Sequence, residues 1–98
     1  MATFISLINL TQQEITDLKD SPGRAAKFSS MAEKVGAKVK EIYWTIGRYD
    51  VVVVMEAPDD KTAAVVLLGL GSLGNVRTQT MRAFDSSEME EIVSKAPD

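Results

Sequence analysis

The residues best suited to chemistry gather around one short turn near the middle of the chain. Two strand-like runs meet at a turn that carries Gly47, which is the pattern of a β-hairpin over residues 38–58. Phenol and carboxyl groups dominate the polar side chains near this turn, and such groups can hold a polar ligand or move a proton. The candidate ligand-binding residues are Tyr43, Thr45, Tyr49, Asp50 and Glu56.

The two faces of this hairpin differ in character. Counting through a two-residue turn at 47–48 places Trp44 opposite Val51 and Ile42 opposite Val53, because side chains alternate between faces. A four-residue loop would instead pair Ile46 with Val51, and it would leave each residue on the same face. One face is then apolar throughout and forms the core: Ile42, Trp44, Ile46, Val51, Val53 and Met55. The other mixes apolar and polar side chains: Glu41, Tyr43, Thr45, Asp50, Val52, Val54 and Glu56. This mixture suits either an interface or a small-molecule cavity between two sheets.

The turn itself carries an aromatic residue and an acid that a hairpin does not need. Tyr49 shares the parity of Trp44, so its ring is expected to close the end of the core. Asp50 begins a strand, where aspartate is disfavoured. We expect its carboxylate to accept hydrogen bonds from turn amides or from a facing subunit. Its role is then structural first, and ligand contact comes second.

Several common kinds of chemistry lack their usual residues. The chain has no histidine and no cysteine, so it lacks the commonest general base and the thiol ligands of zinc. Asp59 and Asp60 at a helix start are expected to cap it rather than bind a metal. Arg77 and Arg82 fall on opposite faces of a strand and cannot form one anion clamp. Neither a cofactor nor a metal is expected.

Residues 69–74 spell Gly-Leu-Gly-Ser-Leu-Gly, which fits the dinucleotide fingerprint letter for letter. That fingerprint needs its glycines between a strand and a helix, so that the phosphates meet the helix N-terminus. Here the glycines follow a helix and precede a strand. They are expected to end the helix and to bind no nucleotide.

Size and composition indicate one small globular domain, residues 1–98. The chain is 45% hydrophobic and 26% charged, with a net charge of −3, and it offers no basic stripe for nucleic acid. No apolar run is long enough to span a membrane, and the N-terminus does not resemble a signal peptide. A cytoplasmic protein is the expectation.

The order of elements predicts an α+β, ferredoxin-like βαββαβ fold. The expected strands cover residues 4–10, the two hairpin arms and 75–84. The dense apolar run at 4–10 suits a central strand, and 75–84 is expected at a sheet edge. Thr11 and Glu14 have capping-box spacing for a short helix. The main helices are expected from a Ser21 cap to Gly36, from an Asp59 cap to the glycines, and from a Ser86 or Ser87 cap near the C-terminus. The second main helix is apolar nearly all round, so cover on more than one side is expected.

Such a chain forms a four-stranded antiparallel sheet with two helices on one face. Its other face, which carries Val52 and Val54, has no helix of its own. A monomer would expose more apolar surface than soluble monomers usually tolerate. A homodimer or higher homo-oligomer, packed sheet to sheet, is therefore expected.

Three blocks of sequence resemble the GYD-domain family: residues 43–50, 56–60 and 71–78. The family takes its name from a Gly-Tyr-Asp signature, and here Arg48 stands between Gly47 and Tyr49. The resemblance covers nearly the whole chain and implies a small domain of the dimeric α+β barrel type. That fold type includes small-molecule-binding regulators, isomerases and metal-free monooxygenases.

Three classes of function follow from these observations. The first is a small-molecule-binding or regulatory module with its ligand between the sheets of a dimer. The second is a cofactor-independent monooxygenase-like or isomerase-like enzyme, with Tyr43, Tyr49 and Asp50 as its acid–base groups. The third is a structural assembly unit. An enzyme of this kind needs a buried acid within hydrogen-bond reach of a cavity.

Overall fold

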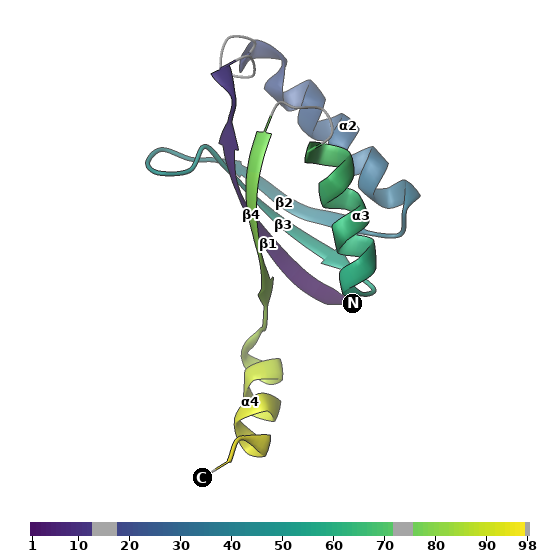
Figure 1. Cartoon of the computed structure of the whole chain (residues 1–98), viewed down its shortest axis with the longest axis vertical. Coiled ribbons are helices and arrows are strands. Elements are labelled where there is room, and N and C mark those ends of the chain that lie inside the picture. Colours follow the sequence, from purple (N-terminus) through teal and green to yellow (C-terminus); the bar gives the residue numbers. More distant parts are fainter. Residues whose placement is uncertain (13–17, 72–75, 98) are drawn as a thin grey trace.

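The computed structural model describes residues 1–12, 18–71 and 76–97. Four strands form one sheet: β1 (Ala2–Leu10), β2 (Lys38–Trp44), β3 (Val51–Ala57) and β4 (Val76–Ala83). Their order is β2-β3-β1-β4, and every neighbouring pair is antiparallel. The expected ferredoxin-like arrangement is confirmed, with the apolar β1 in the centre and the more polar β4 at an edge (Figure 1).

The hairpin register agrees with the register predicted from the sequence. Trp44 pairs with Val51 and Ile42 with Val53, and a bulge between Val39 and Glu41 shifts the register further along β2. The inward side chains of β3 are buried; Val51, Val53 and Met55 are 7%, 3% and 1% exposed. Side chains alternate between the two faces of the sheet, and only one face is covered, so every second residue of β3 is buried.

Two helices, α2 (Ser21–Lys34) and α3 (Asp60–Gly71), cover the same face of the sheet (Figure 1). A short 3-10 turn, η1 (Leu18–Asp20), leads into α2. Gly36 ends α2 with φ 93°, a conformation that glycine adopts without strain. The Asp59 carboxylate caps α3 by accepting the Thr62 amide at 2.8 Å. Both helix boundaries were expected. The short helix predicted from Thr11 extends into residues outside the described part.

The helices and the hairpin depart from the sequence predictions at Ser21, at α3 and at Ile46. Asp20, not Ser21, occupies the N-cap position of α2, and the buried Ser21 hydroxyl instead accepts a hydrogen bond from Trp44. The prediction that α3 is covered on more than one side is not met within one chain, because Val65 and Leu68 are exposed. Ile46, which strand parity placed on the core face, is fully exposed because the strand ends at Trp44.

A last helix, α4 (Ser86–Lys95), projects from the end of β4 away from the sheet and the other helices (Figure 1). Its cap is Asp85 rather than a serine. Asp85 and Glu88 form a reciprocal capping box, which satisfies two amides at the helix start. None of its residues is buried. Among the described residues, no helix is long and apolar enough to cross a membrane.

Candidate functional site

The sheet face opposite α2 and α3 is apolar in its middle and polar at its ends. Residues facing this side pair across three strands: Ile5 lies between Val54 and Met81, and Leu7 pairs with Val52. No helix in the described part of the chain packs on this face (Figure 1). We call this surface the open sheet face; its residues are Ile5, Leu7, Tyr43, Val52, Val54 and Met81.

Tyr49 lies at one end of this open sheet face, and the prediction that its ring closes the core is wrong. Its hydroxyl donates to Gln79 Oε1 at 2.9 Å, and the Arg48 guanidinium lies 5.8 Å from its ring centroid. Strand parity does not govern Tyr49, because residues 45–50 lie outside the strands. Gly47, with φ 122°, lets the loop turn toward β4.

A polar pocket of about 260 Å³ is formed where the hairpin loop meets β1 and β4. Arg48 and Tyr49 come from the loop, and Arg77 comes from the start of β4. Arg48 and Arg77 have no acidic partner among the described residues. We call this the corner pocket; its lining is Leu7, Asn9, Arg48, Tyr49, Arg77, Thr78 and Gln79.

Asp50 anchors the hairpin loop to the central strand. Its Oδ2 accepts the Leu10 amide at 2.8 Å, and its own amide donates to the Ile8 carbonyl at 2.9 Å. The sequence predicted a hydrogen-bonded acid here, but expected the donors to be turn amides or a facing subunit. The donor is the end of β1. The carboxylate thus satisfies a backbone group where the β1–β3 ladder stops.

The other predicted site residues are spread along the sheet. The Thr45 hydroxyl donates to the Tyr49 carbonyl at 2.6 Å and closes the loop. Tyr43 pairs with Val52 in the middle of the open sheet face and is 52% exposed. Glu56 forms an ion pair with Lys40 at 3.2 Å. It lies six residues along β3 from Asp50, roughly 20 Å at the usual strand rise.

The five predicted residues therefore do not form one site. The structure brings Thr45, Tyr49 and Asp50 together at the hairpin end, and it places Tyr43 and Glu56 progressively further away. The sequence pattern did not predict that Arg48, Arg77 and Gln79 lie together. The β1–β4 register, which pairs Asn9 with Arg77 and Leu7 with Gln79, supplies part of this group. Arg48 could not be placed, because a loop has no fixed parity.

Arg82 has a separate role, as its opposite parity predicted. Its guanidinium lies 5.7 Å from the Phe4 ring centroid and 4.5 Å from that of Phe84. It also forms an ion pair with Glu88 at 3.2 Å. Stacking of a cation on aromatic faces and this ion pair fix the junction between β4 and α4.

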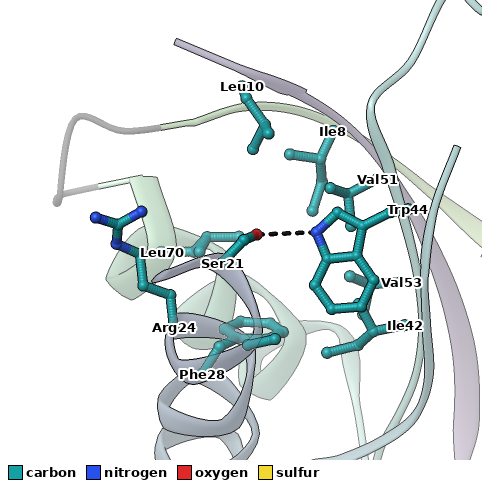
Figure 2. A pocket seen from close by; sticks show the side chains of 11 residues that line it. Ile8, Leu10, Ser21, Arg24, Phe28, Ile42, Trp44, Val51, Val53 and Leu70 are labelled. Carbon is teal, nitrogen blue, oxygen red and sulfur yellow. Dashed lines mark hydrogen bonds between the residues drawn. The ribbon is translucent and has the colours of Figure 1, made fainter. Parts of the chain in front are cut away.

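A second, apolar cavity of about 80 Å³ lies between α2 and the sheet (Figure 2). Figure 2 shows the Trp44 indole donating from Nε1 to the Ser21 hydroxyl, a distance of 2.8 Å, at the side of this cavity. Strand parity predicted Trp44 to be a core residue, but Trp44 is 46% exposed. The volume is well below the several hundred Å³ typical of small-molecule sites. We treat the cavity as part of the packing around Trp44.

Metal chemistry has few candidate ligands. Asp59 is engaged as the α3 cap, and the backbone hydrogen bond from Thr62 holds its pKa below the ordinary value of 3.8. Among the described residues, no group of three or more acidic side chains is placed to hold an ion.

Comparison with known proteins identifies the family. The profile of the GYD domain matches residues 4–93. The chain belongs to the GYD-domain family. A Thermus thermophilus protein described as a "Glutamine synthetase and cystathionine beta-lyase binding protein" is 36% identical over 90 residues, which cover 91% of this chain and 95% of that protein. The crystal structure of TTHA0845, also from Thermus thermophilus, has a TM-score of 0.59 at 26% identity and covers 88% of this chain and 96% of that one.

The signature residues of this GYD domain each have a distinct place in the structure. Gly47 takes the positive φ of the turn. Tyr49 crosses to the edge strand and forms part of the corner pocket. Asp50 joins the loop to the central strand. Together they hold the hairpin loop against one end of the open sheet face.

Proposed function

We propose that this GYD domain is a binding and regulatory protein that acts as a dimer and whose partner is a metabolic enzyme. The observation that carries the proposal is the open sheet face, a mostly apolar surface that α2 and α3 leave bare. The similarity to a relative described as binding two enzymes supports the choice of partner. On this proposal the protein acts in the cytoplasm, together with that enzyme.

A second copy of the chain is the partner for the open sheet face. Tyr43 and Met81 are 52% and 42% exposed there, and the four remaining residues are partly exposed. Two such sheets can pack about 10 Å apart with their side chains interdigitated. This arrangement is the dimeric α+β barrel implied by the family resemblance. It also encloses a space next to Tyr43 and Tyr49 in which a small ligand could be held.

The enzyme partner needs a different surface, and α4 offers one. Met89, Ile92 and Val93 recur at helical spacing and are 49%, 41% and 60% exposed. An isolated helix of ten residues is marginal in water, so an apolar stripe on such a helix favours docking in a groove. The junction through Arg82 and the capping box holds α4 clear of its own sheet.

Binding fits the geometry better than catalysis. A cofactor-independent enzyme requires an acid within reach of a cavity. The Asp50 carboxylate is bound to the Leu10 amide, and it does not line the corner pocket. The Tyr49 hydroxyl donates to Gln79 rather than to open space. A purely structural assembly unit would have no need for an exposed helix such as α4.

Binding to purified glutamine synthetase and cystathionine β-lyase, both from the organism that encodes this GYD domain, tests the proposal. We expect the immobilised GYD domain to bind at least one of them with a saturable signal. Val93→Glu places a charge in the apolar stripe and should weaken binding at least tenfold, which corresponds to about 1.4 kcal/mol. Ser87→Glu adds the same charge on the opposite side of α4 and should leave binding within about threefold.

Two results would contradict the proposal. If neither enzyme binds the wild-type protein, the enzyme-binding function fails. If Val93→Glu and Ser87→Glu weaken binding equally, α4 acts only through its net charge and its apolar stripe is not the docking surface.

A further inference from the structure

We propose that the corner pocket is a binding site for a small organic dicarboxylate. This deepens the proposed function, since such a ligand would be the signal that the protein senses. Only the idea that the ligand regulates the protein rests on the proposed function; the binding site itself is argued from the pocket. None of the described lining residues belongs to α4, so ligand binding can be tested whether or not the enzyme partner is correct.

The charges of the pocket select for an anion. Arg48 and Arg77 lie at the pocket on two different elements, and no acidic side chain of the described residues lines it. Neither arginine is paired with a carboxylate in the described part of the chain. In a chain with a net charge of −3, two unpaired guanidiniums beside one pocket form a local positive site. Guanidinium forks match the geometry of carboxylates, and two of them suit an anion with two such groups.

The neutral lining residues add directional hydrogen bonds. The Tyr49 hydroxyl donates a hydrogen bond to Gln79 Oε1, so the amide nitrogen of Gln79 can donate to a ligand. Asn9 provides a further amide. Leu7 provides an apolar wall against which the methylene groups of a ligand can pack.

The arrangement is partly organised before any ligand binds. Arg48 lies over the Tyr49 ring, and Tyr49 is fixed by Gln79 at one end and by Thr45 at its carbonyl. Asp50 in turn holds the loop to β1. A loop positioned in this way loses less conformational freedom on binding than a free one.

The volume favours a ligand of intermediate size. A volume of about 260 Å³ lies a little below the roughly 300–1,000 Å³ of sites for drug-sized ligands, which favours a smaller molecule. A dicarboxylate with four or five carbons is a ligand of that size, and it carries one carboxylate for each arginine. Inorganic phosphate fills only part of the space, and a nucleotide exceeds it.

Isothermal titration of the full chain at low salt with succinate, glutarate and inorganic phosphate tests the assignment. We expect saturable heat from one of the dicarboxylates with a Kd below about 1 mM, and at least tenfold weaker binding of phosphate. Arg77→Gln and Arg48→Gln should each weaken dicarboxylate binding at least tenfold. Arg77→Lys keeps the charge but loses the fork, and it should give an intermediate loss.

Lys61→Gln is the matched control, because it removes one positive charge from the exposed start of α3 on the other side of the sheet. Its affinity should stay within about twofold of wild type. Absence of saturable heat with 10 mM dicarboxylate, on the order of ten times the expected Kd, overturns the proposal. Phosphate binding as tight as dicarboxylate binding overturns the ligand class, and an equal loss in Lys61→Gln overturns the site.

Discussion

Asp50 provides a direct test of whether a signature residue acts through structure or through a ligand. Asp50→Ala removes the acceptor of the Leu10 amide and leaves a partly buried donor without its partner at the end of the central strand. Asp50→Asn keeps an acceptor of similar shape but removes the charge. The two variants therefore separate the hydrogen bond from the negative charge.

The size of each effect follows from this one contact. A hydrogen bond to a charged group contributes about 1.5–3 kcal/mol and a neutral one about 1 kcal/mol. We expect Asp50→Ala to lower the free energy of unfolding by about 2 kcal/mol and Asp50→Asn by about 1 kcal/mol. For a chain of this size, 1 kcal/mol shifts Tm by about 4–8 °C. The expected losses in Tm are then about 8–16 °C and about 4–8 °C.

Thermal unfolding followed by circular dichroism measures both variants, with Glu33→Gln as the control. Glu33 is exposed on α2, so its neutralisation should leave Tm within about 2 °C. If Asp50→Ala keeps the full wild-type Tm, the carboxylate does not anchor the loop. If that variant keeps its Tm but loses dicarboxylate binding, Asp50 positions the loop for the ligand rather than stabilising the fold.

Two further predictions concern the helices. Ser21→Ala removes the acceptor of the Trp44 indole and should lower the free energy of unfolding by about 1 kcal/mol, or Tm by about 4–8 °C. Ser30 is exposed on the same helix, so Ser30→Ala should leave Tm almost unchanged. Equal losses of Tm in the two variants would refute the role of the Trp44–Ser21 hydrogen bond. Asp59 has a pKa lowered from 3.8, so its capping contribution is present above pH 3.8 and is lost as the pH falls through the lowered value. The Tm difference between wild type and Asp59→Ala should therefore narrow in acid, and a difference that stays constant down to about pH 2 would contradict the charged cap.

Much of the fold was predictable because its signals are local. The apolar run of β1 indicated a central strand, and the alternation through the hairpin gave the pairing of Trp44 with Val51 that the structure shows. Gly36 and Asp59 marked helix ends by chemistry that depends only on neighbouring residues. At the hairpin and at these two helix ends, the deciding interaction lies within seven positions of the residue concerned.

The candidate site was less predictable because its contacts join distant parts of the chain. Tyr49 reaches Gln79, thirty residues away, and Asp50 reaches Leu10, forty residues away. Serine is a favoured capping residue, yet the Ser21 hydroxyl accepts a hydrogen bond from Trp44 instead. A side chain in a loop has no periodicity to fix its direction, so Arg48 could be assigned to the corner pocket only from the structure.

Light scattering during size-exclusion chromatography tests most directly whether a second copy covers the open sheet face. At micromolar concentration we predict a mass of at least twice the 10.7 kDa of one chain. Val54→Lys, in the middle of the open sheet face, should shift the mass toward one chain. Leu68→Lys makes the same kind of change on the exposed face of α3 and should leave the mass unchanged. A wild-type mass of 10.7 kDa would contradict the account.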